Sequence, residues 1–241
     1  MAFYNVKNMK KPKGYITLLH FDEDFIGNYD GYITDEEGNE WRRTGTDNPS
    51  IIISPAQPVK FGTGSLLINN SDTPYTRLKS PVISGLNFGA KDFTIDFWLQ
   101  SLHQSPNEAC IIYGNNIGLR LSFVNVTGTT YKLKLYYSDD NQTWQNIVSN
   151  NGINTAVLTW HHVAIVRNGA YIKLYIDGVL EATGNLAVNF APYYNNGYLI
   201  IGCEGDWGQT QPLTLGVFDE FRIVDYAAWT SNFTPPTEPY N

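Results

Sequence analysis

The sequence predicts an all-β fold, a jelly-roll β-sandwich of two antiparallel sheets formed by one domain at residues 15–241. Apolar and polar residues alternate in many short segments, as in Phe93–Gln100, which is the period of a strand. The 241 residues include 21 glycines and 12 prolines, and only 16% are charged, which is typical of many strands joined by turns. No internal repeat and no long helical periodicity is evident.

The clearest local signal is a β-hairpin between Trp160 and Gly178. Apolar residues alternate along both arms of this segment. Asn168-Gly169 and Asp177-Gly178 are pairs that favour the positive-φ turns of hairpins. We therefore expect three consecutive antiparallel strands with a fixed register.

The remaining elements follow from the same alternation and from the turn residues. The Pro-rich end, 233–241, cannot be a central strand and is expected to run extended along the surface. Residues 1–14 are expected to form a polar leader or anchor, and residues 227–230 one short turn of helix. Further strands are predicted at 15–21, 51–54, 65–69, 75–78, 93–100, 109–113, 118–124, 131–138, 144–148, 198–203 and 217–224, with a short one near Trp41.

Charge and hydropathy restrict the function. The net charge of −7 argues against nucleic acid as a partner. The N-terminus has no apolar signal core, and no apolar run approaches the length of a membrane span. Residues 22–47 hold nine acidic and two basic residues, which suits either a solvated loop or a cation-binding rim. Pairing of the two cysteines, Cys110 and Cys203, stays open.

Several blocks stand out along the sequence. They are Phe61–Ile68, Phe93–Leu99, Trp160–Gly178, Gly216–Ile223 and the turn Tyr137–Trp144, with Ile16–Asp22 opening the domain. Together they resemble the laminin-G-like branch of the concanavalin A-like lectin/glucanase superfamily. The resemblance spans residues 15–240 and rests on the order and spacing of the blocks, because each alone is weak. The closing block, 228–240, is similar to the C-terminal end of such domains in bacteriophage virion proteins.

The resemblance implies a fold and not one function, since the same fold carries lectins, hydrolases and adhesion modules. Hydrolases of this superfamily place paired carboxylates on one strand in a Glu-x-Asp-x-Glu pattern, and no such strand is present here. Asp219 and Glu220 are adjacent, so a regular strand would point them to opposite faces. We therefore expect a protein that is not an enzyme, with no catalytic residues.

A structural calcium ion is implied by the resemblance. Many members hold Ca²⁺ with an aspartate on the last strand and with carbonyl groups near the first strand and an early glycine turn. The corresponding residues here are Asp219, Asp22 and Gly62, and hard oxygen ligands suit Ca²⁺. Alternatively, Asp219 only accepts backbone hydrogen bonds.

Sugar binding needs an aromatic platform and planar polar side chains that fix the hydroxyl groups. Trp207 is the preferred platform, because Gly205 and Gly208 flank it on a loop that follows a strand. Core packing is expected for Trp98, Trp144 and Trp160. The predicted carbohydrate-binding residues are Trp207, Asp206, Gln209, Tyr193, Tyr194 and Asn195.

These features lead to a functional hypothesis. A non-catalytic, lectin-like adhesion domain is expected, displayed on a phage virion surface and therefore extracellular without a signal peptide. Its partners would be surface glycans, and other virion proteins through the basic N-terminal segment. The alternative is a structural module of the virion, such as a capsid decoration or fibre-assembly piece, without a sugar site. A glycoside hydrolase is the weakest reading.

Overall fold

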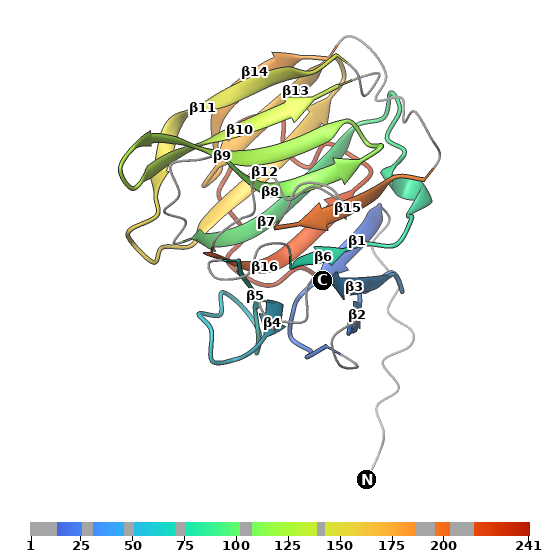
Figure 1. The fold of residues 1–241 in the computed structure, drawn as a ribbon. Coiled ribbons are helices and arrows are strands. Elements are labelled where there is room, and N and C mark those ends of the chain that lie inside the picture. Colours follow the sequence, from blue (N-terminus) through green and yellow to red (C-terminus); the bar gives the residue numbers. More distant parts are fainter. Residues whose placement is uncertain are drawn as a thin grey trace.

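The computed structural model describes residues 14–25, 31–45, 51–70, 76–101, 108–138, 143–186, 196–202 and 215–241. In it, two eight-stranded antiparallel sheets lie face to face (Figure 1). This arrangement confirms the predicted all-β sandwich.

Sheet 1 has the strand order β14-β13-β12-β7-β16-β5-β4, and β1 also pairs with β16. Strand β16 is long enough to pair with both β5 and β1 along the same edge, because its first half pairs with β5 and its last residues pair with β1. Its strands are β1 (Tyr15–Leu19), β4 (Ile51–Ile53), β5 (Leu66–Asn69), β7 (Phe93–Ser101), β12 (His161–Asn168), β13 (Tyr171–Ile176), β14 (Val179–Asn185) and β16 (Leu215–Val224).

Sheet 2 has the order β11-β10-β9-β8-β15-β6-β3-β2. A short 3₁₀ helix, η1 (Ser84–Leu86), lies between β6 and β7 in the chain. The strands of sheet 2 are β2 (Tyr32–Thr34), β3 (Glu40–Thr44), β6 (Arg77–Lys79), β8 (Ala109–Asn115), β9 (Leu119–Thr127), β10 (Thr130–Tyr137), β11 (Gln145–Asn154) and β15 (Tyr198–Ile201).

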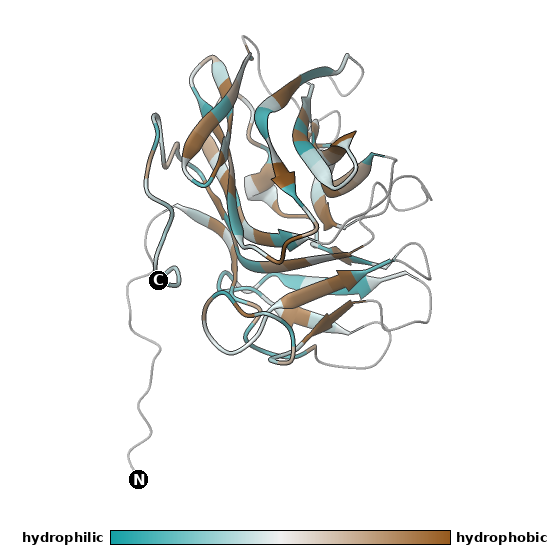
Figure 2. Cartoon of the chain, turned by 90° about the vertical axis from the view of Figure 1, so that its left-hand side faces the viewer, coloured by the Kyte–Doolittle hydropathy of each residue, from teal (hydrophilic) through white to brown (hydrophobic). Residues whose placement is uncertain are grey.

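The core lies between the two sheets and follows from the alternation in the sequence. In β10, buried and half-buried residues alternate without interruption, so Tyr131, Leu133 and Leu135 face the core. The strands in Figure 2 show the same pattern of brown and teal bands. Phe97 contributes from sheet 1 and packs against Phe221, with ring centroids 5.8 Å apart.

The predicted hairpin is present, and one of its two turns differs in detail. Asp177 and Gly178 both have positive φ, at 51° and 77°, as a type I′ turn requires. In the first turn, Asn168 pairs with Tyr171, so the loop residues are Gly169 and Ala170 rather than Asn168 and Gly169. Gly169 at φ 59° takes the first loop position, as in a type II′ turn.

Other expectations are confirmed or corrected. The short strand near Trp41 is β3. The segment 144–148 belongs to a longer strand, because residues 152–154 also pair with β10 beyond an irregularity in the register. No helix forms at 227–230, where Thr94 Oγ1 instead accepts the Ala228 N–H at 2.9 Å and donates to the Tyr226 carbonyl.

The C-terminal segment, 225–241, lies on the outer face of sheet 1. It is extended and contains no strand, as its prolines predict. Trp229 and Phe233 stack on each other and pack over Ala164, Val166 and Tyr175 of that face. Sheet 1 is therefore covered on both faces over β12 and β13.

No helix in the described ranges is long and apolar enough to cross a membrane. Of the proposed leader, only Gly14 belongs to the described residues, and its carbonyl accepts the Asp225 N–H.

Candidate functional site

The six residues predicted to bind sugar lie outside the described residues. They are Trp207, Asp206, Gln209, Tyr193, Tyr194 and Asn195. The nearest described residues are Asn196 and Gly202, at the two ends of β15. In the sequence the two groups lie on either side of β15, and they stay predictions.

Asp22 holds the glycine-rich loop at residues 62–64. Its Oδ1 accepts the N–H of Thr63 at 2.5 Å and of Gly64 at 3.0 Å. Gly62 has φ 66°, and a Cβ there would lie 2.2 Å from Asp22 Oδ1. Glycine is therefore required at 62 for the aspartate to approach the loop.

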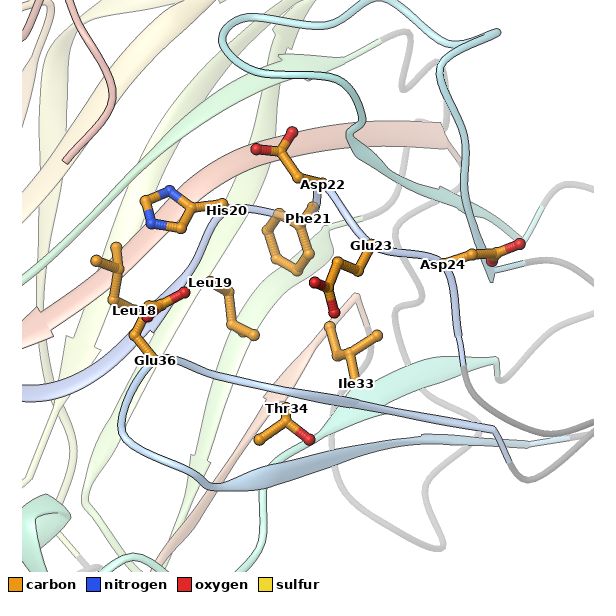
Figure 3. Close-up of a pocket in the computed structure, with 10 residues that line it drawn as sticks. All are labelled: Leu18, Leu19, His20, Phe21, Asp22, Glu23, Asp24, Ile33, Thr34 and Glu36. Carbon is orange, nitrogen blue, oxygen red and sulfur yellow. The ribbon is translucent and has the colours of Figure 1, made fainter. Parts of the chain in front are cut away.

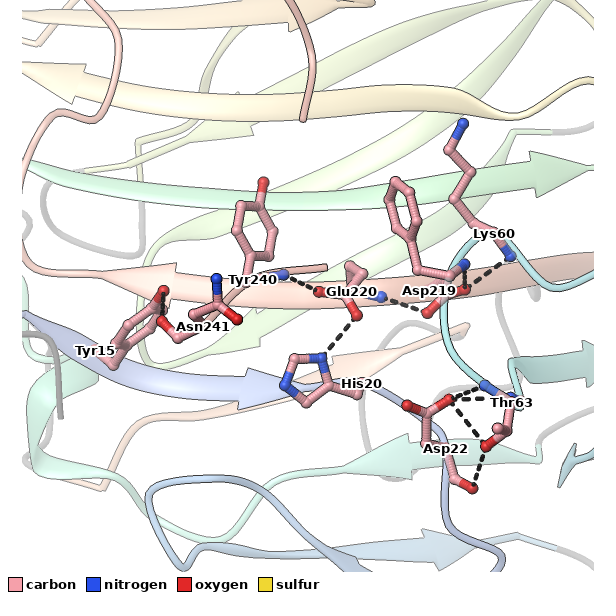
Figure 4. A network of polar contacts seen from close by, with 11 residues as sticks. Tyr15, His20, Asp22, Lys60, Thr63, Asp219, Glu220, Tyr240 and Asn241 are labelled. Atoms are coloured by element: carbon pink, nitrogen blue, oxygen red, sulfur yellow. Dashed lines mark hydrogen bonds and ion pairs between the residues drawn. The ribbon is translucent and has the colours of Figure 1, made fainter. Parts of the chain in front are cut away.

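Asp219 holds the start of the same loop (Figure 4). Its Oδ2 accepts the N–H of Lys60 at 2.9 Å and of Phe61 at 3.0 Å, and its Oδ1 accepts the N–H of Glu220 at 2.8 Å. Burial raises the pKa of the Asp219 carboxyl to about 7, while the N–H donors at Phe61 and Lys60 act in the opposite direction.

Three residues predicted to hold calcium therefore meet at one loop, with both aspartates turned toward N–H donors. A calcium site needs oxygen ligands around the ion, and N–H groups do not provide them. Among the described residues, no group of three or more His, Cys, Asp or Glu side chains is arranged for a metal. These contacts fit a clamp on the loop better than a cation site, and calcium at Asp22, Gly62 and Asp219 stays a prediction.

A β-bulge changes the expected directions of Asp219 and Glu220. The register of β16 against β7 shifts after Asp219, and Glu220 has φ 50°. Both carboxylates can then contact segments packed on sheet 1. Glu220 Oε1 lies 2.7 Å from His20 Nδ1, and Oε2 accepts the N–H of Tyr240 at 2.8 Å (Figure 4).

A pocket of ≈ 280 Å³ lies at the end of β1 and contains part of the acidic segment (Figure 3). The carboxylates of Asp22, Glu23 and Asp24 point in different directions in this view. Asp35, just beyond the pocket, is buried and accepts the N–H groups of Glu37 and Asn39 in the β2–β3 turn. The described acids therefore resemble a solvated loop with structural contacts more than a cation-binding rim.

The structure also shows the surroundings of Trp98, Trp144 and Cys110. Trp98 is buried, as expected, and the Lys60 ammonium lies 3.8 Å from its ring centroid. The expectation for Trp144 was wrong, since 40% of its surface is exposed just before the edge strand β11. Cys110 is buried in β8, and Cys203 lies outside the described residues.

The outer face of sheet 2 carries a cross-strand row of mostly aromatic and polar side chains, which the fully buried Ile200 interrupts. Residues paired across neighbouring strands point to the same face, and the pairing registers connect all eight strands of the sheet. Tyr136, Tyr113 and Tyr32 are half-buried in this row. In strand order from β11, the row is Asn146, Tyr136, Arg120, Tyr113, Ile200, Lys79, Arg42 and Tyr32.

A hydrogen-bonded network fixes one end of the row. The Tyr136 hydroxyl donates to Glu108 at 2.9 Å, and Arg120 Nη2 donates to the same carboxylate at 2.8 Å. Arg120 Nε donates to Ser122. Burial acts to raise the pKa of Glu108, but the hydrogen bonds from Arg120 and Tyr136 hold it below its usual range. The Tyr136 ring is therefore held in place by an ionised carboxylate.

The other end of the row borders a second pocket of ≈ 320 Å³. Arg42 and Lys79 belong both to the pocket wall and to the row. The Lys79 ammonium lies 4.0 Å from the ring centroid of Tyr198 on the neighbouring strand. Glu40, Thr44, Ser80 and Pro81 complete the pocket lining.

This face was not predicted as a site. Alternation marks Lys132, Lys134 and Tyr136 as one face of a strand, which the sequence shows directly. The row itself depends on strand pairs that are far apart in the chain, such as Arg42 with Lys79 and Tyr113 with Ile200. Only the sheet order brings them together.

Solved structures of sugar-binding and receptor-binding domains resemble this fold. Domain 4 of AbnA, an extracellular arabinanase from Geobacillus stearothermophilus, in complex with arabinotriose, matches with TM-score 0.62 and 18% identity over 89% of this chain and 93% of that one. The binding domain of botulinum neurotoxin DC, in complex with rat synaptotagmin II, matches with TM-score 0.59 and 14% identity over 90% and 49%.

The botulinum neurotoxin serotype D binding domain matches with TM-score 0.58 and 15% identity, over 89% of this chain and 49% of that one. The chain thus spans about half the length of these toxin domains. At such identities the likeness shows the fold alone. No curated protein matches the sequence.

A family model shows the relationship more directly. The Laminin_G_3 model, described as the concanavalin A-like lectin/glucanases superfamily, matches residues 70–230, which is more than half of the chain. The matched range includes the predicted hairpin and six of the eight residues of the cross-strand row, because only Tyr32 and Arg42 precede residue 70.

The chain therefore belongs to the concanavalin A-like lectin/glucanase superfamily.

Proposed function

We propose that the protein is a non-catalytic carbohydrate-binding domain and that the outer face of sheet 2 contacts the sugar. The observation that carries this proposal is the cross-strand row. Its tyrosine rings offer apolar surface to the C–H face of a pyranose, and its amide, guanidinium and ammonium groups can bind hydroxyl groups.

The extended shape of the row suits a chain of sugars. Ile200 is fully buried, so the accessible part with the two tyrosines runs from Asn146 to Tyr113, four strands or roughly 14 Å. Tyr136 is already fixed by Glu108, so less rotamer freedom is lost when a ligand binds. The sugar complex of the arabinanase domain supports the proposal by showing that a related fold binds an oligosaccharide.

Two observations support a role without catalysis. Hydrolysis needs two carboxylates that face an open site across the scissile bond. Asp96 is fully buried beneath the C-terminal segment, and Glu108 is engaged by Arg120 and Tyr136. These two acids are better suited to holding the structure.

The test is a glycan array with purified protein and three single substitutions. Tyr136→Ala and Tyr113→Ala each remove one ring of the row, and we expect each to weaken binding about 2- to 10-fold. Tyr171→Ala is the matched control, because Tyr171 is an exposed tyrosine of sheet 1. Unchanged melting temperatures will show that the variants are folded.

The array also separates this face from the predicted loop site. Loss of binding in Trp207→Ala, with Tyr136→Ala unaffected, would place the sugar at the loop. Absence of binding to any glycan by the unmodified protein would refute the proposed function.

We further propose that the domain is displayed on a phage virion, with surface glycans as its target. The support is the similarity of residues 228–240 to the ends of such domains in virion proteins. The second candidate, a structural module of the virion, predicts co-purification with a virion protein that depends on residues 1–14. Retained co-purification after their deletion would count against the anchor role.

A further inference from the structure

Trp144 adds an exposed aromatic ring to the edge of sheet 2, beside the tyrosines of the cross-strand row. It lies directly before β11, and 40% of its surface is exposed. A single exposed apolar side chain is ordinary on a protein surface. Val148, however, is also 38% exposed on the same edge strand, and the half-buried Tyr136 lies on the neighbouring strand. The edge therefore carries a group of apolar side chains.

Alternation along β11 turns Trp144 toward the face of the row. Ile147 packs against the core, so Asn146 and Val148 on either side of it point outward. The same alternation, continued by two residues, places Trp144 on the outer face with Asn146. Asn146 pairs with Tyr136, so Trp144 and Tyr136 are diagonal neighbours, roughly 7–8 Å apart and within reach of large aromatic side chains.

Trp144 offers a larger open ring than Tyr136. Arg120 Cζ lies 5.0 Å and Lys134 Nζ lies 4.4 Å from the ring centroid of Tyr136, so these two cations occupy part of the space over that ring. An indole is also larger than a phenol ring. A sugar at this edge therefore finds more apolar surface at Trp144, and the exposed amide of Asn146 lies next to it for the hydroxyl groups.

The aromatic rings of this face lie too far apart for one sugar to contact them all. Tyr136 is on β10 and Tyr113 is on β8, while Trp144 lies one strand further out. Three strand spacings across the sheet and two residues along β11 separate Trp144 from Tyr113, which is roughly 16 Å or about three sugar rings. A monosaccharide covers only part of this distance.

We infer that Trp144 is the stacking platform at the outer end of the site, and that the site binds the chain of a linear oligosaccharide of at least about three units. The inference rests on the proposed function and specifies its ligand class, because a single terminal sugar is excluded. One sugar ring lies against Trp144 with Asn146 at its hydroxyl groups, and the following units cross β10 and β9 toward Tyr113.

Affinity as a function of chain length tests the ligand class. The probes are cello-, xylo- and malto-oligosaccharides and the linear glycan with the strongest signal on the array, each as mono-, di-, tri- and tetrasaccharide. We expect the affinity for at least one series to rise about 10-fold or more from the monosaccharide to the trisaccharide. A monosaccharide that binds as tightly as its own tetrasaccharide would overturn the inference, as would binding confined to branched glycans.

Two substitutions of Trp144 test the platform. Trp144→Ala removes the ring and should weaken binding of the trisaccharide about 10-fold, whereas Trp144→Phe keeps an aromatic ring and should restore part of the affinity. Tyr171→Ala removes an exposed ring from sheet 1 and is the matched control, which should leave the affinity unchanged. Equal affinities of Trp144→Ala and Tyr171→Ala for the trisaccharide would rule out the platform.

Tryptophan fluorescence gives a second readout. A sugar stacked on Trp144 shields its indole from acrylamide quenching, and Trp144→Phe should abolish this protection, because Trp41 and Trp98 are buried in the fold itself. Protection that persists in Trp144→Phe and disappears in Trp207→Phe would place the sugar at the predicted loop and contradict the inference.

The outcomes distinguish this inference from the proposed function. Binding that is weakened in Tyr136→Ala but not in Trp144→Ala would leave carbohydrate binding at this face intact and remove only the platform. Absence of binding to every glycan of the array and of the length series would refute both.

Discussion

At the scale of single residues, the most constrained group is Asp96 on the outer face of sheet 1. It is fully buried and accepts hydrogen bonds from Arg222 Nε at 2.9 Å and from the Tyr240 hydroxyl, with His162 Nε2 3.2 Å away. Burial acts to raise its pKa, but Arg222, His162 and Tyr240 hold the pKa of Asp96 below its usual range. One ionised carboxylate thus joins β7, β12, β16 and the C-terminal segment.

Replacing Asp96 with asparagine should destabilise the fold strongly. The change leaves the buried Arg222 guanidinium without its counter-ion, and breaking a buried ion pair in this way costs about 3–5 kcal/mol. Urea denaturation of Asp96→Asn and of the unmodified protein will measure the difference. A loss below 1 kcal/mol would show that water or other groups replace the pair.

Asp177 predicts how stability depends on pH. Burial acts to raise its pKa, but hydrogen bonds from His161 and from the His162 N–H lower the pKa of Asp177 overall. A carboxyl whose pKa is lowered in the folded state stabilises the fold at any pH above its pKa in the unfolded chain, which is about 3.9. That stabilisation is lost as the pH falls through its pKa in the folded state.

The melting temperature of Asp177→Asn should therefore be lower than that of the unmodified protein at pH 7. The gap should begin to narrow below about pH 4 and should close as the pH falls through the lowered pKa of Asp177, where the native carboxyl is protonated as well. Thermal melts across this range will show it. A gap that stays constant down to pH 2 would mean that the carboxylate charge is not responsible.

At the scale of elements, the C-terminal segment depends on the turn between β13 and β14. The Phe233 N–H donates to the Gly178 carbonyl at 2.9 Å, and Asn232 Oδ1 accepts the Leu180 N–H at 2.8 Å. A Cβ on Gly178 would lie 1.9 Å from the Phe233 carbonyl oxygen. The glycine is therefore needed both for the turn and for contact with the segment.

Gly178→Ala should destabilise the protein more than Gly169→Ala. Both glycines have positive φ, at 77° and 59°, so both substitutions introduce backbone strain of roughly 1–3 kcal/mol. Only Gly178 also faces a close atom, whereas no atom of the described chain lies within 4 Å of a Cβ at Gly169. Denaturation of the two variants will give the free energy of unfolding that each has lost. Equal losses would show that the C-terminal segment moves away from the added methyl group without loss of stability.

Local sequence signals predicted the elements better than their ends. Turn glycines and alternation located the β12–β13–β14 hairpins, because these depend on neighbouring residues. The second half of β11 was missed, since its Asn- and Gly-rich sequence resembles a loop and only pairing with β10 makes it a strand. Residues 227–230 were predicted as a helical turn, but contacts with Thr94 hold them in another conformation.

At the scale of the whole molecule, the two sheets have different outer faces. That of sheet 1 is occupied by the C-terminal segment over β12 and β13, while that of sheet 2 carries the row of tyrosines and cations. The sequence contains every residue of this row, yet strand order and register decide that Arg42 lies beside Lys79 and Tyr113 beside Arg120. Such long-range pairing is not encoded in any local pattern.

The loop at residues 60–64 connects distant parts of the chain and offers the last test. Asp22 follows β1, Asp219 lies in β16, and both hold this loop through its N–H groups. Asp219→Ala leaves three N–H donors without this acceptor and should cost at least about 1–3 kcal/mol. If the clamp acts alone, the loss will be equal in calcium and in chelator. A calcium ion bound by the native state would add stability that depends on its concentration. The unmodified protein would then melt higher in calcium than in chelator, and Asp219→Ala would remove that difference as well.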